Sequence, residues 1–155
     1  DYLTGMYNRR FFFDEGHNLH EQAKANDITL FAAMIDVDHF KKVNDTYGHD
    51  CGDIVLKHLA ARLAAHFPDD LAARLGGEEF VVLIVGEDKQ TTLGRLENFR
   101  WSIEQEAAHC GETSVAFTVS IGACHALQEN LDAMLKTADE NLYQAKRNGR
   151  NRVVA

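Results

Sequence analysis

Blocks of apolar residues, separated by polar turns, divide the chain into short strand-like runs and longer helix-like segments. The run ITLFAAMI at 28–35 is almost unbroken and predicts a central strand sheltered on both faces. Two runs at 71–75 and 80–85 are joined by a Gly-Gly-Glu-Glu sequence, which predicts a hairpin. Residues 115–123 predict a fourth strand, and 152–154 are expected to add a short strand at the sheet edge.

The remaining segments have the periodicity of helices. Val55, Leu59 and Leu63 lie at i, i+4 and i+8, which stacks their side chains on one side of a helix. Pro68 ends that helix, and Gly149 is placed to end the last one. The predicted helices cover 8–25, 40–47, 53–66, 91–108 and 131–147.

This order of elements contains the pattern β-α-β-β-α-β. It predicts an α+β, ferredoxin-like core with an antiparallel-rich sheet and helices packed on one face. In that layout the end of the first strand lies beside the turn of the central hairpin, so we expect Asp36 close to Glu78 and Glu79. A single domain is expected to account for 1–155, because a chain of this length leaves little room for a second one.

Acidic residues gather at these two points of the predicted layout. Asp36 and Asp38 follow the apolar strand, and Glu78 and Glu79 follow two glycines. A carboxylate at a buried strand end is costly unless a cation offsets its charge, and Mg²⁺ prefers such oxygen ligands. Acidic strand ends also occur in proteins without a metal, and Asp-x-Asp alone carries little information. The glycines favour a ligand site, because they permit positive φ and leave the backbone open to close approach.

Composition narrows the class of protein. With 45% hydrophobic and 26% charged residues, the chain is typical of a globular domain. The net charge of −8 argues against a non-specific binder of nucleic-acid polymers, although a metal can still hold a nucleotide there. No apolar run reaches the roughly 18 residues that span a bilayer, and the first residues do not resemble a signal peptide. We expect a cytoplasmic domain cut from a longer protein, which can itself be membrane-bound.

The three cysteines, Cys51, Cys110 and Cys124, are widely spaced and form no CxxC pair. Their arrangement supports neither a zinc site nor dithiol redox chemistry. We therefore expect all three to be small buried hydrophobic residues in a protein of a reducing compartment.

Taken together, the motifs resemble the GGDEF domain family of diguanylate cyclases. Gly76-Gly77-Glu78-Glu79-Phe80 resembles the family signature in its GGEEF form. Other motifs of the family follow in order along the whole chain: DYLTG at 1–5, NRR at 8–10, DVDHFK at 36–41, ND at 44–45, GHD at 48–50, GD at 52–53, AD at 138–139, LY at 142–143, AK at 145–146 and GRN at 149–151. The resemblance implies a ferredoxin-like fold of the nucleotidyl-cyclase type. It also implies the condensation of two GTP molecules into cyclic di-GMP, with release of pyrophosphate.

The resemblance implies a role for each matching acidic residue. Asp36, Glu78 and the main-chain carbonyl of Val37 would bind metal, two Mg²⁺ or Mn²⁺ ions per site. Glu79 would be a second catalytic acid, either as a metal ligand or as an aid to deprotonation of the attacking 3′-hydroxyl. Two metals held by carboxylates can bridge phosphates and stabilise both the entering and the leaving oxygen.

Further matches concern the triphosphate. Main-chain N–H groups of His39, Phe40 and Lys41 would hold the β- and γ-phosphates, since free donors at the start of a helix favour anions. Lys146 and Arg150 are four residues apart on one predicted helix face, from which both would reach the triphosphate. Without the motif, they would be read as a solvated basic helix end.

Two residues match the pair that reads guanine, Asn44 and Asp53. A carboxylate can accept hydrogen bonds from guanine N1–H and from the exocyclic amine, whereas adenine presents a lone pair at N1. Asp53 would therefore favour GTP over ATP, and it would also serve as a helix cap before Ile54.

One departure from the family concerns feedback by the product. Many members carry an inhibitory Arg-x-x-Asp site ahead of the signature, and here Phe67 stands in place of the arginine while Asp70 is kept. Phenylalanine cannot donate the bidentate hydrogen bonds that hold a phosphate or a guanine edge. We expect weak or absent inhibition through this degenerate site.

The expected partners follow from the reaction. Two GTP molecules must meet, so catalysis is expected to need a homodimer, with an upstream sensor domain supplying the contact. Two alternatives remain open: a receptor domain that binds GTP or cyclic di-GMP without turnover, and a domain that serves only as an interaction element of a sensor protein. The retained signature acids argue against the first, and the Gly-Gly-Glu-Glu turn is unexplained by the second.

Overall fold

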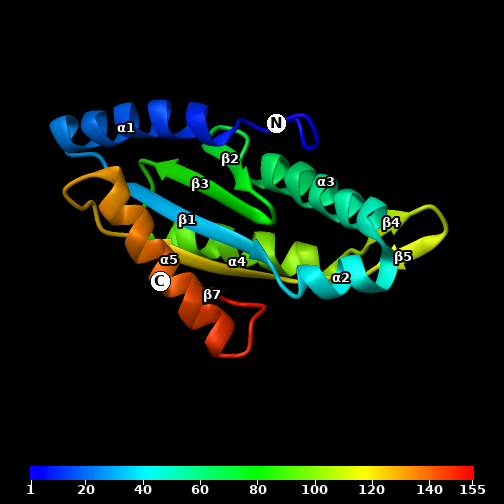
Figure 1. Cartoon of the computed structure of the whole chain (residues 1–155). Coiled ribbons are helices and arrows are strands. Elements are labelled where there is room, and N and C mark those ends of the chain that lie inside the picture. The colour runs from blue at the N-terminus through cyan, green and yellow to red at the C-terminus, as the bar shows by residue number, and fades with distance from the viewer.

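The computed structural model describes residues 1–155 as a five-stranded sheet covered by helices (Figure 1). The elements are α1 (Arg9–Asn26), β1 (Leu30–Val37), α2 (Phe40–Tyr47), α3 (His49–His66), β2 (Leu71–Gly76), β3 (Glu79–Val85), α4 (Lys89–Gln105), β4 (Ala108–Cys110), β5 (Thr113–Val115), β6 (Val119–Cys124), α5 (Leu131–Arg147) and β7 (Val153–Val154). The predicted elements are all present, although α3 begins four residues earlier than expected and α4 ends three residues earlier.

The strands have the order β2-β3-β1-β6-β7. The first four pair antiparallel, and β7 joins the edge in parallel with β6. Strand β1 lies at the centre, and its last acidic residue, Asp36, is opposite Glu79 on β3 and Ser120 on β6. The predicted antiparallel-rich α+β sheet is therefore confirmed, as is the closeness of Asp36 to the hairpin turn.

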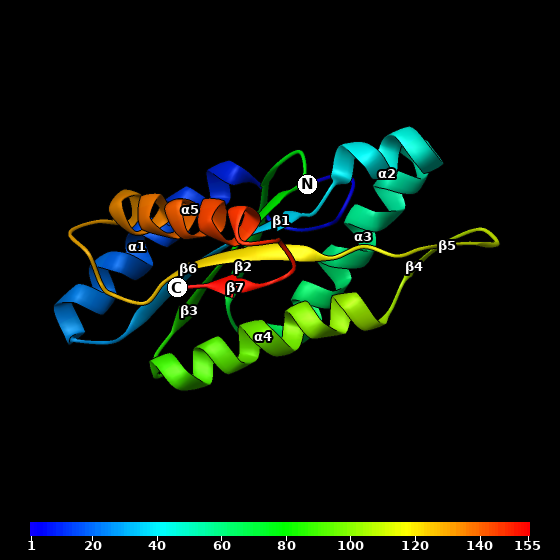
Figure 2. The same cartoon turned by 90° about the horizontal axis from the view of Figure 1, so that it is seen from below.

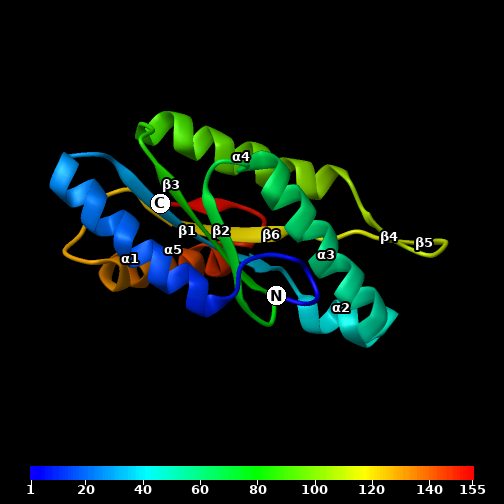
Figure 3. The ribbon, with the colours of Figure 1, turned by 90° about the horizontal axis from the view of Figure 1, so that it is seen from above.

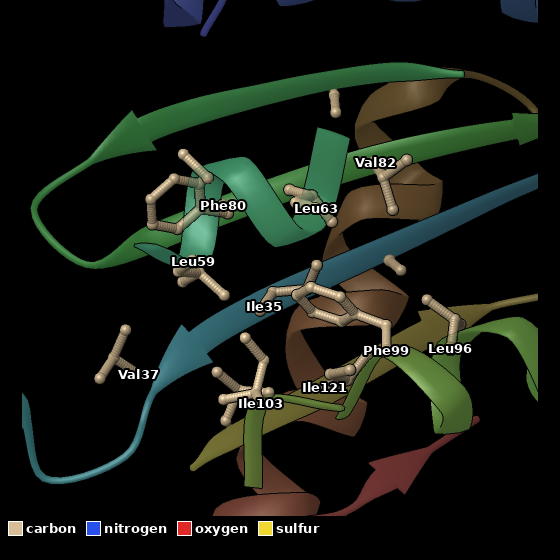
Figure 4. Packing of buried hydrophobic residues seen from close by; sticks show 14 of the residues in the cluster. Ile35, Val37, Leu59, Leu63, Phe80, Val82, Leu96, Phe99, Ile103 and Ile121 are labelled. Atoms are coloured by element: carbon tan, nitrogen blue, oxygen red, sulfur yellow. The ribbon is translucent and has the colours of Figure 1, made fainter. Parts of the chain in front are cut away.

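Alternate residues of β1 pack against different helices. Ile35 and Val37 belong to the larger core, which lies between the sheet and helices α3 and α4 (Figure 4). Ala32 and Met34 belong to a second core beneath α1 and α5. Figure 2 shows α5 and α4 on opposite sides of the sheet. The prediction that helices cover one face is correct only for α3 and α4, because α1 and α5 carry apolar stripes of their own that cover the other.

Helix α5 lies unusually close to the sheet at one glycine of β6. A Cβ atom on Gly122 would lie 2.0 Å from the main-chain nitrogen of Leu142 and 2.2 Å from the carbonyl oxygen of Ala138. Only glycine permits such an approach of two backbones. The close packing sets the height of the next turn of α5, which carries Lys146, above the sheet.

A two-stranded ribbon, β4–β5, interrupts the predicted connection between α4 and β6. It extends beyond the sheet beside α2 and α3 (Figure 3). Cys110 at the end of β4 forms a disulfide with Cys51 on α3. The prediction of three buried, unpaired cysteines is therefore wrong for these two, which are partly exposed, and correct for Cys124, which is buried and free. No helix in the structure is both long and apolar enough to cross a membrane.

Candidate active site

The buried end of β1 carries a carboxylate of which one oxygen has no hydrogen-bond partner. Asp36 is only 4% exposed, and its Oδ2 accepts a hydrogen bond from the Lys146 ammonium. The other oxygen, Oδ1, is buried without a hydrogen-bond partner. Burial raises the pKa of Asp36 above its ordinary value, and the Lys146 charge opposes that shift only in part. A buried oxygen of this kind is expected to have a partner when the site is complete.

The turn between β2 and β3 brings two more carboxylates to this end of the sheet. Gly76 and Gly77 have φ of 151° and 49°, as the sequence predicted for a turn that only glycine forms without strain. The guanidinium of Arg74 holds the turn by donating to the Gly77 carbonyl from Nε at 3.0 Å and from Nη2 at 2.7 Å. These hydrogen bonds fix the shape of the turn, which in turn determines the positions of the Glu78 and Glu79 side chains.

Glu78 is the carboxylate that interacts with Asp36. Its burial, and next the nearby charge of Asp36, raise the pKa of Glu78 above its ordinary value. Glu79 lies on β3 directly opposite Asp36, so both side chains leave the same face of the sheet, but Glu79 is exposed. Three carboxylates therefore share one corner of the fold, with one Lys146 ammonium among them.

This corner fits a metal ion that a nucleotide helps to bind. No three Asp, Glu, His or Cys side chains converge closely enough to hold an ion by themselves. Asp36 and Glu78 repel each other, and Asp36 Oδ1 lacks a partner. A cation between the two carboxylates would offset their repulsion and bind the unpaired oxygen. Mg²⁺ usually binds through one or two carboxylates together with substrate phosphates, and the carbonyl of Val37 is the adjacent main-chain oxygen.

Asp38 is as deeply buried as Asp36 but is fully bonded. Its Oδ1 accepts from Ser120 Oγ at 2.6 Å, and its Oδ2 accepts from Thr118 Oγ1 at 2.7 Å and from the Asn151 N–H at 3.0 Å. These bonds join the end of β1 to β6, to the residue just before β6 and to the C-terminal turn. Asp38 therefore positions the loop that leads into α2, a function that the sequence did not reveal.

The start of α2 offers main-chain donors next to Asp36. His39 precedes the helix in the left-handed region, with φ of 55°, and Phe40 and Lys41 are its first residues. Their N–H groups have no carbonyl four residues back within the helix, and no other backbone bond satisfies them. This end of α2 is suited to phosphate oxygens. The Lys41 side chain points elsewhere, to an exposed ion pair with Asp45 at 2.9 Å.

The two basic residues near the C-terminus are placed differently from each other. Lys146 lies on α5 and contacts Asp36. Arg150 does not share its helix face, because α5 ends at Arg147 and the chain then passes through Gly149 and Arg150 with φ of 119° and 65°. Such values cannot continue a right-handed helix, so the predicted i, i+4 arrangement is wrong. Arg150 instead lies in the turn that Asp38 fixes through the next residue, Asn151.

Asn44 and Asp53 come from two helices that pack closely. A Cβ atom on Gly52 would lie 1.8 Å from Asn44 Oδ1, so the amide rests directly against the backbone next to Asp53. Asn44 Oδ1 is buried without a partner. Asp53 is exposed in the second turn of α3 and is not a helix cap, since that helix begins at His49. A buried amide oxygen without a hydrogen-bond partner and an exposed carboxylate at one helix junction suit a base with N–H donors.

Phe67 and Asp70 have structural partners in this chain. Phe67 is buried against the ring of Phe99, with the Arg95 guanidinium 4.7 Å from its ring centre. Asp70 accepts from Arg95 at 3.0 Å, and Arg95 also pairs with Glu87. The degenerate product site is thus occupied by contacts within the chain.

The family is decided by a match over nearly the whole chain. The family described as "Diguanylate cyclase, GGDEF domain" matches residues 1–152. The chain belongs to the GGDEF domain family. Among the curated relatives of this GGDEF domain are the response regulator PleD of Caulobacter vibrioides, 41% identical over 160 residues, and the probable diguanylate cyclase DgcT of Escherichia coli, 41% identical over 161 residues. Each alignment covers 99% of this chain but 35% of the relative, so the chain spans about a third of their length.

Solved structures of GGDEF domains have the same fold. The GGDEF domain of DgcB from Caulobacter crescentus, solved with c-di-GMP, has a TM-score of 0.94 and 35% identity, covering 100% of this chain and 94% of that one. The active GGEEF domain of a diguanylate cyclase from Vibrio cholerae has a TM-score of 0.88 and 30% identity, covering 96% of each chain. The predicted family and fold are therefore confirmed.

Proposed function

We propose that this GGDEF domain is a diguanylate cyclase that condenses two GTP molecules into cyclic di-GMP and releases pyrophosphate. The observation that carries the proposal is the placement of Asp36 and Glu78, two carboxylates with raised pKa, beside the free N–H groups that begin α2. The alignment with named diguanylate cyclases supports the same reaction.

Asp36, Glu78 and the Val37 carbonyl are the residues that would hold the metal, two Mg²⁺ or Mn²⁺ ions in each site. When bound, the ions would polarise the α-phosphate and neutralise charge on the entering and leaving oxygens. Glu79 is exposed on the same face as Asp36, a position suited to a second ligand or to a base that draws the proton from the 3′-hydroxyl.

The remaining residues bind and orient the nucleotide. The N–H groups at 39–41 would hold the β- and γ-phosphates, and the Lys146 ammonium would move from Asp36 toward the triphosphate. Arg150 would reach the triphosphate separately, from the turn that follows α5. Asp53 would accept from guanine N1–H and the exocyclic amine, and the amide of Asn44 would turn from its buried position against Gly52 to contact the base. This arrangement selects guanine, because adenine has no N1–H to donate.

Catalysis requires a second copy of the domain. The residues described form a single nucleotide site, whereas the product joins two GTP molecules, each 3′-hydroxyl attacking the other α-phosphate. A two-fold pair with the sites facing each other satisfies both attacks at once. We infer that a further domain of the whole protein, such as an upstream sensor, controls this pairing, and that the reaction takes place in the cytoplasm, where GTP is available.

The test is a product assay on this chain fused to a dimeric coiled coil. With GTP and Mg²⁺, the fused protein should form cyclic di-GMP, detected by chromatography. Glu78→Ala should form none while its circular dichroism spectrum is unchanged, and Glu21→Ala on exposed α1 is the matched control. Undiminished turnover by Glu78→Ala would contradict the metal assignment. Nucleotide binding without product would favour the receptor alternative, and no thermal stabilisation by GTP and Mg²⁺ would favour the interaction element.

A further inference from the structure

The β4–β5 ribbon is attached to the guanine end of the site by a covalent bond. Cys110 ends β4 near the tip of the ribbon, and its sulfur is bonded to that of Cys51 in the first turn of α3. Their Cα atoms are 5.5 Å apart, within the usual range for a disulfide. Figure 1 shows the ribbon beside the N-terminal end of α3.

The ribbon has little else to hold its tip. Each strand has three residues, and so short a two-stranded ribbon is marginally stable alone. Its base is fixed, because Ala108 and Val115 are buried in the core and Glu106, just before β4, pairs with Arg62. Between 109 and 114, however, no hydrogen bond or ion pair reaches another element. The disulfide is therefore the bond that fastens the tip of the ribbon to α3.

The start of α3 also lacks its usual support. Its N-cap is Gly48, which has no side chain to accept from the first N–H groups of the helix. Cys51 lies in that uncapped turn, Gly52 packs against Asn44, and Asp53 follows. The two proposed guanine contacts thus depend on a helix end that a disulfide holds from the side facing the ribbon.

We infer that the Cys51–Cys110 disulfide is a redox-responsive positioning element, which keeps Asp53 and Asn44 in register for guanine and so sets the affinity for GTP. This inference rests on the proposed function. In a reducing compartment a disulfide is typically transient and redox-sensing, and both cysteine residues are partly exposed at the surface. Reduction would release the ribbon tip and loosen the first turn of α3, while the sheet-bound carboxylates keep their places.

The switch works by thiol–disulfide exchange with a dithiol. One thiolate of the reductant attacks a sulfur of the Cys51–Cys110 bond, forming a mixed disulfide and releasing the other cysteine as a thiolate, which takes up a proton. The second thiol of the reductant then displaces the bound cysteine. Two electrons pass to the protein, which ends with two thiols, and the reductant ends as a cyclic disulfide. A disulfide oxidant reverses both steps.

The state of the cysteines is measured first, by alkylation and mass spectrometry of the purified chain. Without reductant only Cys124 should be modified, after denaturation, and all three cysteines should be modified after treatment with dithiothreitol. Modification of all three without reductant, in protein exposed to air, would overturn the inference at this step.

The decisive measurement compares cyclic di-GMP formation by the coiled-coil-fused protein in the oxidised and reduced states. Reduction should raise the KM for GTP roughly 5- to 10-fold, with kcat at saturating GTP almost unchanged. Reoxidation should restore the KM. Cys51→Ser and Cys110→Ser should each have the raised KM in both states, whereas Cys124→Ser should keep the full response, with circular dichroism confirming that each variant is folded. Turnover with the same KM in both states would overturn this inference alone, whereas no turnover in either state would count against the proposed function.

Discussion

The two ends of the proposed nucleotide site are built in different ways. At the phosphate end, Asp38 accepts three hydrogen bonds, and Arg74 holds the Gly77 carbonyl. At the guanine end, Asp53 is exposed on a helix without a capping side chain, and Asn44 has an unpartnered oxygen. One end is fixed by hydrogen bonds to the sheet, and the other by the packing of two helices and a disulfide.

This difference is expected to separate the rate of the chemical step from the recognition of the base. Transfer of a nucleotidyl group depends on reacting atoms held within about 0.5 Å of a productive geometry, which a hydrogen-bonded sheet end can provide. Recognition of the base depends on contacts remote from the reacting atoms. We therefore expect substitutions at the phosphate end to lower kcat, and substitutions at the guanine end to raise KM.

The largest effect should come from Glu78→Gln. The amide keeps the size of the side chain but cannot neutralise a metal ion, so kcat should fall about a thousandfold or more. The affinity for Mn²⁺, measured by titration in the presence of GTP, should decrease as well. A variant that loses turnover but binds Mn²⁺ as tightly as the wild type would place Glu78 outside the metal site.

Asp38→Ala should disturb the phosphate end without removing any proposed ligand. The change leaves Ser120, Thr118 and the Asn151 N–H without an acceptor, which should lower the free energy of unfolding by about 2–4 kcal/mol in urea titrations. In the protein that remains folded, kcat should fall more than KM rises. Ser120→Ala removes only one donor and should cost about 1–2 kcal/mol. Equal decreases in the free energy of unfolding in the two variants would show that the hydrogen bonds of Asp38 to Thr118 and Asn151 do not add to its bond with Ser120.

Asp53→Asn tests the guanine end. The amide can accept only one of the two guanine hydrogen bonds, so the KM for GTP should rise about 10- to 100-fold while kcat changes little. Discrimination against ATP should decrease in competition assays. Asp69→Asn, at another exposed aspartate, is the matched control. A fall in kcat without a change in KM would contradict the division between the two ends.

The pH dependence of stability should be small and specific to the metal-free protein. Because the pKa values of Asp36 and Glu78 are raised in the folded state, folding binds protons, and stability decreases as pH rises from the ordinary carboxyl pKa through the raised values. Glu78→Gln should remove part of this loss. Since Glu78 is partly exposed, the gain at neutral pH should be at most about 0.5 kcal/mol, or about 1–2 °C in Tm. Calorimetry with a chelator present measures this difference in Tm. A lower Tm for Glu78→Gln than for the wild type would show that Asp36 and Glu78 do not repel each other.

The smallest effect is expected at the degenerate product site. Phe67 is buried and Asp70 is paired with Arg95, so cyclic di-GMP should not bind there. Calorimetric titration of nucleotide-free protein should show no tight binding, and Asp70→Ala should not change that result. If the wild type bound cyclic di-GMP tightly and Asp70→Ala did not, Asp70 would leave its ion pair with Arg95 to bind the product.

Much of the phosphate end could be predicted because its residues follow elements with strong patterns. The apolar run before Asp36 and the two glycines before Glu78 define a strand end and a turn, and the β-α-β-β-α-β order places them side by side. The roles proposed for these residues remain predictions. The sequence does not reveal the structural roles of Asp38 and Arg74. The partners of Asp38 are far away along the chain, and Arg74 donates to a main-chain carbonyl, that of Gly77, which no side-chain pattern indicates.

The guanine end was harder to predict because its support comes from distant, short elements. Strands of three residues carry no readable period. The sequence pattern therefore predicts a helix to 108 and a strand from 115 with no element between them, whereas the helix ends at Gln105 and the strand begins at Val119. Cys51 and Cys110 are separated by 59 residues, and their pairing depends on that ribbon. The i, i+4 spacing misplaces Arg150, because it extends from Lys146 across the helix end that Gly149 marks.

Gly122 has no side chain, yet its close contact with α5 sets the position of the Lys146 ammonium relative to Asp36. Ala138, Leu142 and Lys146 form one row along α5, so any side chain at Gly122 would push this row away from the sheet and carry the ammonium off Asp36. A single methyl group on the sheet side of α5 would therefore abolish the proposed activity, with every residue of the proposed site still present in the sequence.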